Sequence, residues 1–366
     1  MNLAIAGIGT AVPRHSISQV QAAQVAKRVC CRSEEEAAIL PALYRHTGID
    51  SRHMVFADDA VADVLDGTSR SGCEFLPAAS GELGPRTGSR MARYVAEAAP
   101  LAIQATRQAL DRSGLRAAEF THLVTISCTG FSAPGLDIAL VKELGLSRAI
   151  ERAQIGFMGC HGAIDGMRVA HAFASAGRLA RILLCAVELC SVHYFYGWDP
   201  KKLVANSLFA DGAAALVGVA EDSPSNSWQV KATGSCLFPD SEYAMTWNIG
   251  DHGFEMTLST RVPSLIAAHL RPWLVGWLKQ LGLSIGEIAS WAVHPGGPRI
   301  LAAVEESLSL PRDALEVSRE VLARYGNMSS PTVLFILERL RARLAPLPCV
   351  ALAFGPGLVA EAALFV

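Results

Sequence analysis

Short apolar runs and amphipathic stretches alternate along this chain, which predicts strands and helices that follow one another in turn. The apolar runs predict strands at residues 3–8, 122–127, 153–157, 181–187, 213–219, 290–293, 349–354 and 359–366. The stretches with helical spacing predict helices at residues 18–29, 34–46, 88–113, 136–144, 163–176, 262–281, 299–307 and 331–344. Nearly continuous apolar strands are typical of a sheet covered by helices on both faces. The pattern therefore predicts an α/β protein.

The order of these elements recurs in the two halves of the chain. In each half, a strand ends in a loop rich in small residues, a helix follows, and a pair of apolar strands closes the unit. This match favours a duplicated α/β unit over two unrelated domains. The polar stretch 221–227 is the best candidate linker. We therefore expect an N-terminal half at residues 1–222 and a C-terminal half at residues 223–366.

Composition narrows the class of protein. Of 366 residues, 51% are hydrophobic and 18% are charged, so we expect a large buried core and further burial between subunits. A net charge of −2 without a dense Lys/Arg run argues against nucleic acid as a partner. The sequence has neither a signal-peptide pattern at its start nor an apolar run that could span a membrane. We expect a cytoplasmic protein.

The nine cysteines are an odd number and include no CxxC pair, as is typical of a reduced, intracellular chain. Cys160 is distinctive because it lies between small residues where a buried strand is predicted to turn into a helix. Backbone amides and the helix dipole stabilise a thiolate at such a position. A structural role is the alternative, since free cysteine is often simply buried. A zinc site at Cys185, Cys190 and His193 is disfavoured because no second ligand pair follows.

His294 and Asn327 also fall at predicted junctions between regular elements. His294 follows the strand at residues 290–293, and Asn327 precedes the helix at residues 331–344. Junctions at strand ends are where α/β folds collect catalytic groups, and a cysteine with distant His and Asn is a known nucleophile pattern. A turn role for His294 and a helix-capping role for Asn327 remain the alternatives.

Five motifs then occur in a characteristic order. They are FMGC at 157–160, FADGAA at 209–214, HPGGP at 294–298, GNMSSP at 326–331 and GPGL at 355–358. In this order they resemble the signatures of type III polyketide synthases, the chalcone-synthase-like family. The resemblance implies a thiolase-like, five-layered αβαβα fold, a homodimer, and a catalytic triad of Cys160, His294 and Asn327.

The chemistry that the resemblance implies fits these residue types. Cys160 would carry the growing chain as a thioester, with its thiolate paired to His294. His294 and Asn327 would stabilise the enolate that forms when a malonyl thioester loses CO₂. The expected substrates are malonyl-CoA and a starter acyl-CoA, with no metal ion and no redox cofactor. The expected product is a pyrone, a resorcinol or a related aromatic compound.

Further positions carry over from the resemblance. Phe209 matches a gatekeeper phenylalanine between the CoA tunnel and the cavity, and Met256 stands at the second gatekeeper position. Cys128, Cys190 and His193 stand at cavity positions and resemble the bacterial type, and Ser329 matches a cavity-lining serine beside the triad. Pro356 matches the loop that shapes the cyclisation pocket, and Ala133 stands at a position that reaches the partner subunit. Arg45, His46 and Arg52 are the candidate contacts for CoA phosphates, with ordinary surface charge as the alternative.

Several alternatives stay open. Ala133 and Met256 favour a tunnel for a fatty acyl starter, whereas Cys128 favours malonyl-only priming, as in tetrahydroxynaphthalene synthases. Ketoacyl synthase III uses the same three residue types, but its histidine region usually reads His-Gln-Ala-Asn, unlike the loop at His294. A papain-like hydrolase is disfavoured because this sequence lacks the nucleophile motif of that class. A non-catalytic scaffold is disfavoured because all three residues of the triad are present.

Overall fold

The computed structural model of the chain describes residues 1–76, 82–221 and 228–366. Its largest sheet has nine strands in the order β11-β12-β13-β8-β1-β7-β6-β4-β5. These strands are β1 (Asn2–Ala11), β4 (His122–Ser127), β5 (Glu151–Gly156), β6 (Arg181–Leu189), β7 (Asp211–Glu221), β8 (Gln229–Leu237), β11 (Ser290–Val293), β12 (Cys349–Gly355) and β13 (Val359–Phe365). β4 runs parallel to β5 and β6, and β11 runs parallel to β12, while the remaining pairs are antiparallel.

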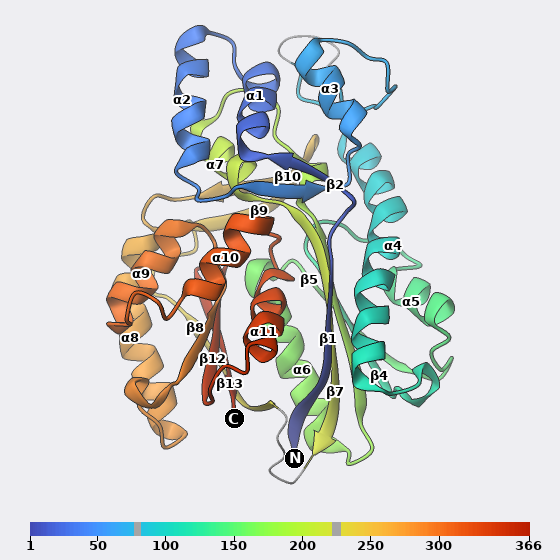
Figure 1. Ribbon diagram of the computed structural model, residues 1–366, viewed down its shortest axis with the longest axis vertical. Helices are drawn as coiled ribbons and strands as arrows, with labels where there is room; N and C mark the ends of the chain where they lie inside the picture. The colour runs from blue at the N-terminus through green and yellow to red at the C-terminus, as the bar shows by residue number, and fades with distance from the viewer. Residues whose placement is uncertain (77–81, 222–227) are drawn as a thin grey trace.

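Helices cover both outer faces of the sheet and fill the space between its two halves (Figure 1). The outer helices are α4 (Thr87–Ser113) and α5 (Leu136–Leu144) on one side, and α8 (Val262–Gln280) and α9 (Pro298–Leu308) on the other. The central helices are α6 (Gly162–Ala176) and α11 (Thr332–Ala342). Their shared core joins strands of both halves, for example Ile126 and Leu184 to Ala351 and Ala363. The result is a five-layered αβαβα arrangement.

Two glycines let α4 lie directly on β1. A Cβ atom at Gly7 would lie 2.4 Å from the carbonyl oxygen of Ala109, and one at Gly9 would lie 2.2 Å from that of Ala105. Such distances are far below van der Waals contact, so only glycine permits this approach of helix to strand.

Smaller elements form a cap at one end of the layers (Figure 1). They are β2 (His15–Ser18), α1 (Gln19–Cys30), α2 (Glu34–Arg45), β3 (Ser51–Met54), α3 (Asp58–Asp66), α7 (Pro200–Leu208), β9 (Met245–Gly250), β10 (Gly253–Leu258) and α10 (Glu316–Tyr325). Ser18 caps α1 by accepting a hydrogen bond from the amide of Gln21, and the Gln21 side chain returns to Ser18. The cap lies over the ends of the strands that lead into the predicted catalytic loops.

Most predicted elements are present within a few residues, but three expectations need comment. The strand that precedes Cys160 was expected to be buried, and this is wrong, because β5 is an edge strand whose residues are half-buried or exposed. The sequence pattern did not predict α3, α7 and α10 or strands β2, β3 and β8 to β10. Most of the expected linker, residues 222–227, lies outside the described residues.

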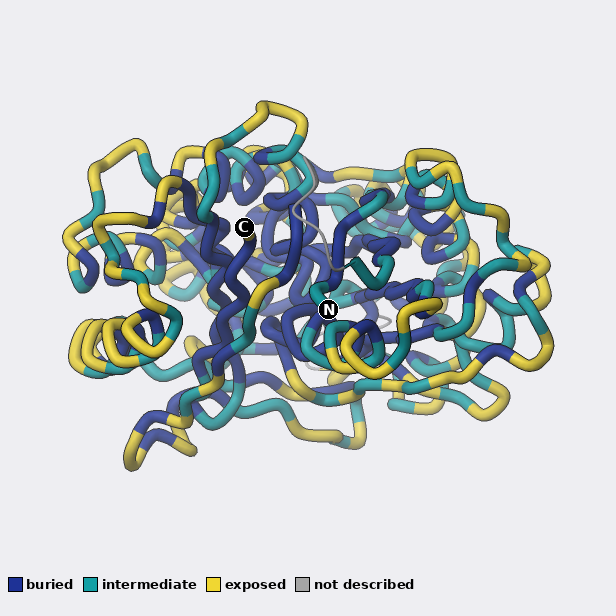
Figure 2. Tube along the Cα trace, turned by 90° about the horizontal axis from the view of Figure 1, so that it is seen from below, coloured by how far each residue is buried: buried dark blue, intermediate teal, exposed yellow. Residues whose placement is uncertain are grey.

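Buried residues concentrate in the strands and central helices, while the outer helices and cap present exposed faces (Figure 2). Among the described residues, none of the helices has the length and apolar character needed to cross a membrane.

Candidate active site

The candidate nucleophile lies in a tight turn between β5 and α6. A short 3-10 helix at Gly159–His161 holds Cys160, so the residue precedes α6 rather than lying in its first turn. Gly159 has φ +76°, and a Cβ there would lie 2.4 Å from Cδ of Pro356. Glycine is therefore required both by the backbone conformation and by the packing of the Pro356 loop against this turn. The Cys160 side chain is buried in the described protein.

Cys160, His294 and Asn327 all line one small, buried cavity of about 20 Å³. We call it the smaller cavity. Each residue comes from a different junction, as predicted: the turn before α6, the loop after β11 and the loop after α10. Phe209, at the end of α7, lines the same cavity. The fold thus brings together three residues that are far apart in sequence.

The His294 imidazole is buried, and both of its ring nitrogens lack a hydrogen-bond partner within the described protein. Its main chain is fixed by a hydrogen bond from its amide to the carbonyl oxygen of Leu352, 2.8 Å long. Buried polar groups are normally paired. An unpaired imidazole that lines a cavity is therefore well suited to interact with a bound substrate.

Asn327 is oriented by its own loop. Its Oδ1 accepts a hydrogen bond of 2.8 Å from the amide of Ser329, which leaves the side-chain NH₂ group to face the cavity that Asn327 lines. The preceding Gly326 has φ +73°, and Ser329 also adopts a positive φ of 58°. The amide is thus a preorganised donor for a developing oxyanion.

Burial sets the protonation states of the two candidate reactive groups. Desolvation raises the pKa of the Cys160 thiol to about 12, against the lowering effect of the Ser329 and Asn327 side chains. Desolvation lowers the pKa of His294 to about 3, with a further lowering by the charge of His161. Both effects favour a neutral thiol beside a neutral imidazole. Burial by itself thus opposes charge on both groups, and the thiolate–imidazolium pair of Cys160 and His294 stays a prediction.

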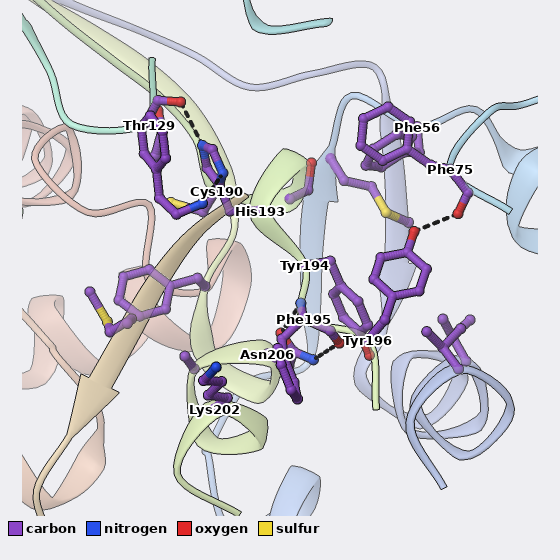
Figure 3. Close-up of a pocket in the computed structure, with 18 of the residues that line it drawn as sticks. Phe56, Phe75, Thr129, Cys190, His193, Tyr194, Phe195, Tyr196, Lys202 and Asn206 are labelled. Atoms are coloured by element: carbon purple, nitrogen blue, oxygen red, sulfur yellow. Dashed lines mark hydrogen bonds between the residues drawn. The ribbon is translucent and has the colours of Figure 1, made fainter. Parts of the chain in front are cut away.

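A larger cavity, of about 400 Å³, lies on the other side of Phe209 and shares that side chain with the smaller one. Six of the predicted substrate-binding positions line it: Phe209, Met256, Cys128, Cys190, His193 and Ser329. Figure 3 shows Thr129, Cys190 and His193 on one side of this cavity and Phe56 and Phe75 on the other. Phe209 thus stands between the candidate catalytic groups and most of the lining.

His193 is fixed as a neutral ring. Its Nδ1 accepts a hydrogen bond of 2.9 Å from the amide of Phe254, and Nε2 therefore donates to the carbonyl oxygen of Thr129 at 2.7 Å. The ring also stacks on Phe254, with 4.2 Å between centroids. Burial lowers the pKa of His193 to about 3. It can shape the cavity, but it has no free nitrogen with which to act as a base.

Glu188 is a buried acidic residue that the sequence analysis missed. One carboxylate oxygen accepts hydrogen bonds from the amides of Cys128 and Thr129, at 2.9 and 3.0 Å, and from the Thr129 hydroxyl at 2.8 Å. The other oxygen accepts from the Ser330 hydroxyl at 2.6 Å. Burial raises the pKa of Glu188 to about 7. This carboxyl group ties the loop of Cys128 to the loop of Asn327, and a lone acid within the apolar run of β6 was the signal for it.

Cys128 supports the nucleophile turn directly. The amide of Gly159 donates to the Cys128 sulfur at 3.0 Å, and the Cys128 thiol lies 3.8 Å from the carbonyl oxygen of Gly159. Trp247 belongs to the same region, although no motif in the sequence pointed to it. Its indole N–H donates to the carbonyl oxygen of Cys128 at 2.7 Å. These contacts make Cys128 both a cavity-lining residue and a support for the turn that holds Cys160.

Other predicted positions are not brought to the two cavities. Ala133 is exposed and precedes a cis proline, and Arg45 and His46 are exposed on the cap. Pro356 packs on Gly159 and does not line either cavity. The cyclisation role of Pro356, the partner-facing role of Ala133 and the phosphate roles of Arg45 and His46 stay predictions.

Arg52 has a different place from the one expected for a CoA phosphate contact. Its side chain is buried, and Nη1 donates to the carbonyl oxygens of Asn206 and Phe209 at 2.6 and 2.7 Å. A guanidinium engaged in this way holds the end of α7 and the gatekeeper Phe209 in position. Arg52 also lines the larger cavity, and its role as a CoA phosphate contact stays a prediction.

Among the described residues, a cluster of metal-ligating types lies behind the nucleophile, namely His161, Asp165 and Glu361. Nδ1 of His161 lies 2.6 Å from an Asp165 oxygen. The guanidinium of Arg168 forms hydrogen bonds with both Asp165 and Glu361. The space between the two carboxylates thus already holds a cation, so the donor set does not suit a metal ion.

Comparison with known families gives matches over nearly the whole chain. A model described as "Chalcone and stilbene synthases, N-terminal domain" matches residues 2–222. A second, described as "Chalcone and stilbene synthases, C-terminal domain", matches residues 229–366.

Individual relatives cover the chain equally well. It is 33% identical over 363 residues to 1,3,6,8-tetrahydroxynaphthalene synthase of Streptomyces peucetius subsp. caesius, covering 98% of this chain and 91% of the relative. It is 34% identical over 371 residues to alpha-pyrone synthesis polyketide synthase-like Pks18 of Mycobacterium tuberculosis, covering 99% and 90%. The crystal structure of PKS-I from the brown alga Ectocarpus siliculosus matches with a TM-score of 0.91 at 30% identity, covering 100% and 98%. This structural neighbour has the thiolase-like fold, which confirms the predicted fold class.

Proposed function

Because the chain belongs to the chalcone and stilbene synthase family of type III polyketide synthases, which form carbon–carbon bonds from CoA thioesters, we propose that it extends a CoA-linked starter with malonyl-CoA. Each extension is a decarboxylative condensation, and cyclisation completes the product. The observation that carries the proposal is the smaller cavity, in which Cys160, His294 and Asn327 meet.

Loading begins from the neutral pair that burial favours. The unpaired imidazole of His294 takes the proton of the Cys160 thiol as the sulfur attacks the thioester carbonyl of the starter. The new Cys160 thioester forms as the bond to CoA breaks, and the departing CoA sulfur receives the proton. His294 is then positively charged only while the substrate occupies the site.

Extension uses the same groups as hydrogen-bond donors. Loss of CO₂ from malonyl-CoA leaves an enolate, whose oxygen accepts hydrogen bonds from the His294 N–H and the Asn327 NH₂ group. The enolate carbon attacks the Cys160 thioester, and the thiolate leaves. The lengthened chain is then a CoA thioester that can return to Cys160. These steps are redox-neutral.

We favour an acyl-CoA starter, and the apolar lining of the larger cavity supports this choice. The second candidate is malonyl-only priming with formation of a naphthalene product. Two observations favour it: Cys128 lines the cavity, and one relative is a tetrahydroxynaphthalene synthase.

The test is incubation of the purified protein with labelled malonyl-CoA and a panel of starter CoA thioesters. We expect release of labelled CO₂ and polyketide products whose masses rise by successive extensions. Hydrolysis of acyl-CoA without extension, or a single condensation onto an acyl carrier protein, would contradict the proposal.

We also propose that the protein is a homodimer. β5 is an edge strand of the sheet, and the exposed side chains of Phe131 and Met158 flank the nucleophile turn. A second copy would cover this apolar surface. Light scattering should give twice the chain mass of 38.9 kDa, whereas a monomer at working concentration would contradict the proposal.

We further propose that the protein works in the cytoplasm. All nine of its cysteines are free, including buried ones at the candidate site. This state suits a reducing compartment. Fractionation of the source cells would test it, and recovery outside the cytoplasm would contradict it.

A further inference from the structure

The larger cavity extends well beyond the groups that the proposed reaction uses. One end lies beside the nucleophile turn, at Cys128, Gly159 and Ser329. The cavity then continues past Tyr194 and Phe195 towards the cap (Figure 3). It thereby runs from the nucleophile turn to helices that play no part in the chemistry.

The far end of the larger cavity is built from aliphatic side chains on two cap helices. Ala22, Val25 and Val29 share one face of α1 because they lie three and four residues apart. Val61 and Val64 face the same space from α3. Val25, Val29, Val61 and Val64 are half-buried: each borders the cavity, and all but Val64 also pack against the small core of the cap.

Three polar side chains on the way to the far end, those of Asn206, Tyr194 and Tyr196, already have hydrogen-bond partners. Asn206 bonds the main chain of Phe195 through both ends of its amide, at 2.8 and 3.0 Å. The Tyr196 hydroxyl donates to the carbonyl oxygen of Phe75 at 2.5 Å, and the Tyr194 hydroxyl pairs with that of Tyr44 at 3.4 Å. These groups line the route without being free to bind an oxygen-rich chain.

We propose that the far end, at Ala22, Val25, Val29, Val61 and Val64, binds the aliphatic tail of a fatty acyl starter while its thioester carbonyl lies at Cys160. This assignment rests on the proposed function and names its starter class. The polar thioester then lies near Ser329 and Asn327, and the tail lies against α1 and α3. A malonyl primer has no such tail and would leave the far end unused.

The first test is the dependence of activity on starter length. Each methylene that moves from water into the far end should raise kcat/KM roughly three- to fourfold, until the cavity is full. The series is acetyl-, butanoyl-, octanoyl-, dodecanoyl- and palmitoyl-CoA, each with malonyl-CoA. A profile that is flat, or that favours acetyl-CoA, would overturn the assignment.

A matched pair of variants on α1 distinguishes an effect of filling the cavity from a general loss of activity. Val25→Trp fills the far end, whereas Val20→Trp adds the same side chain at a position that is 73% exposed. The measured quantity is the ratio of kcat/KM for dodecanoyl-CoA to that for butanoyl-CoA. We expect this ratio to fall at least tenfold in Val25→Trp and to keep the unmodified protein's value in Val20→Trp. An unchanged ratio in folded Val25→Trp would overturn the assignment.

A cross-linking experiment locates the tail without relying on turnover. A dodecanoyl-CoA analogue with a diazirine at the end of its chain should label peptides of α1 or α3, as mapped by mass spectrometry. Labelling confined to other elements would overturn the tail site. If the starter is extended with malonyl-CoA but the cross-link lies on other elements, only the proposed tail site is wrong. If no starter is extended at all, the proposed function itself fails.

Discussion

Phe209 and Asn327 are joined by an isolated parallel β-bridge. The amide of Asn327 donates to the carbonyl oxygen of Leu208 at 2.9 Å, and the amide of Ala210 donates to that of Asn327 at 2.8 Å. The residue that separates the two cavities and the proposed oxyanion donor therefore share one rigid piece of backbone. Movement of the α7 end would displace both.

Arg52 should control the stability of this bridge. Arg52→Met removes the two hydrogen bonds to the carbonyl oxygens of Asn206 and Phe209 and leaves both oxygens buried without that donor. We expect a loss of about 3 kcal/mol in the free energy of unfolding, measured by urea denaturation. Arg45→Met, at an exposed position, is the control and should change it by less than about 0.5 kcal/mol. Equal effects of the two changes would show that Arg52 has no special structural role.

Asn327 should act mainly on the decarboxylation step. Asn327→Ala removes a preorganised donor, so CO₂ release from malonyl-CoA should slow by about two to three orders of magnitude, with much less effect on starter loading. Loading is measured as the mass gain of the intact protein, and Asn248→Ala at an exposed position of β9 is the control. Comparable losses in both steps would point to misfolding or to another role for Asn327.

Glu188 should make stability depend on pH. Burial raises its pKa from 4.5 to about 7, so the folded protein holds this proton more tightly than the unfolded chain does. The associated stabilisation is complete below the unfolded pKa and is lost as pH rises through the folded value. The free energy of unfolding of the unmodified protein, minus that of Glu188→Gln, should fall by about 3 kcal/mol between about pH 4 and about pH 8. A difference that is constant over this range would contradict the shifted pKa.

The sequence predicted the site better than its surroundings. Cys160, His294 and Asn327 lie at junctions between apolar runs and helices, and such junctions are visible in the hydrophobic pattern. The exposure of β5 was missed because the prediction rested on the apolar residues of 153–157, although Glu151, Arg152 and Gln154 are typical of an edge strand. The pKa shifts of Cys160 and His294 come from burial in three dimensions, which the hydrophobic pattern along the chain does not show.

In the cap, too, the sequence pattern did not show which side chains line a cavity. The valines at positions 25 and 29 fit the helical pattern of α1 equally well as core or as cavity lining. In the structure they do both, because they pack against a cluster that includes Leu203 of α7 and also border the larger cavity. Arg52 likewise looked like a surface cation because arginine is usually exposed, and its burial follows from contacts with residues more than a hundred positions away.

The central claim is that Cys160 carries the acyl chain, and intact-protein mass spectrometry tests it most directly. The unmodified protein, Cys160→Ala and the control Cys236→Ala are each incubated with octanoyl-CoA and then with malonyl-CoA. We predict an octanoyl adduct that hydroxylamine removes and that maps to Cys160 in the unmodified protein and the control, together with extended products. Cys160→Ala should show neither. An adduct on another residue, or continued extension by Cys160→Ala, would contradict the account.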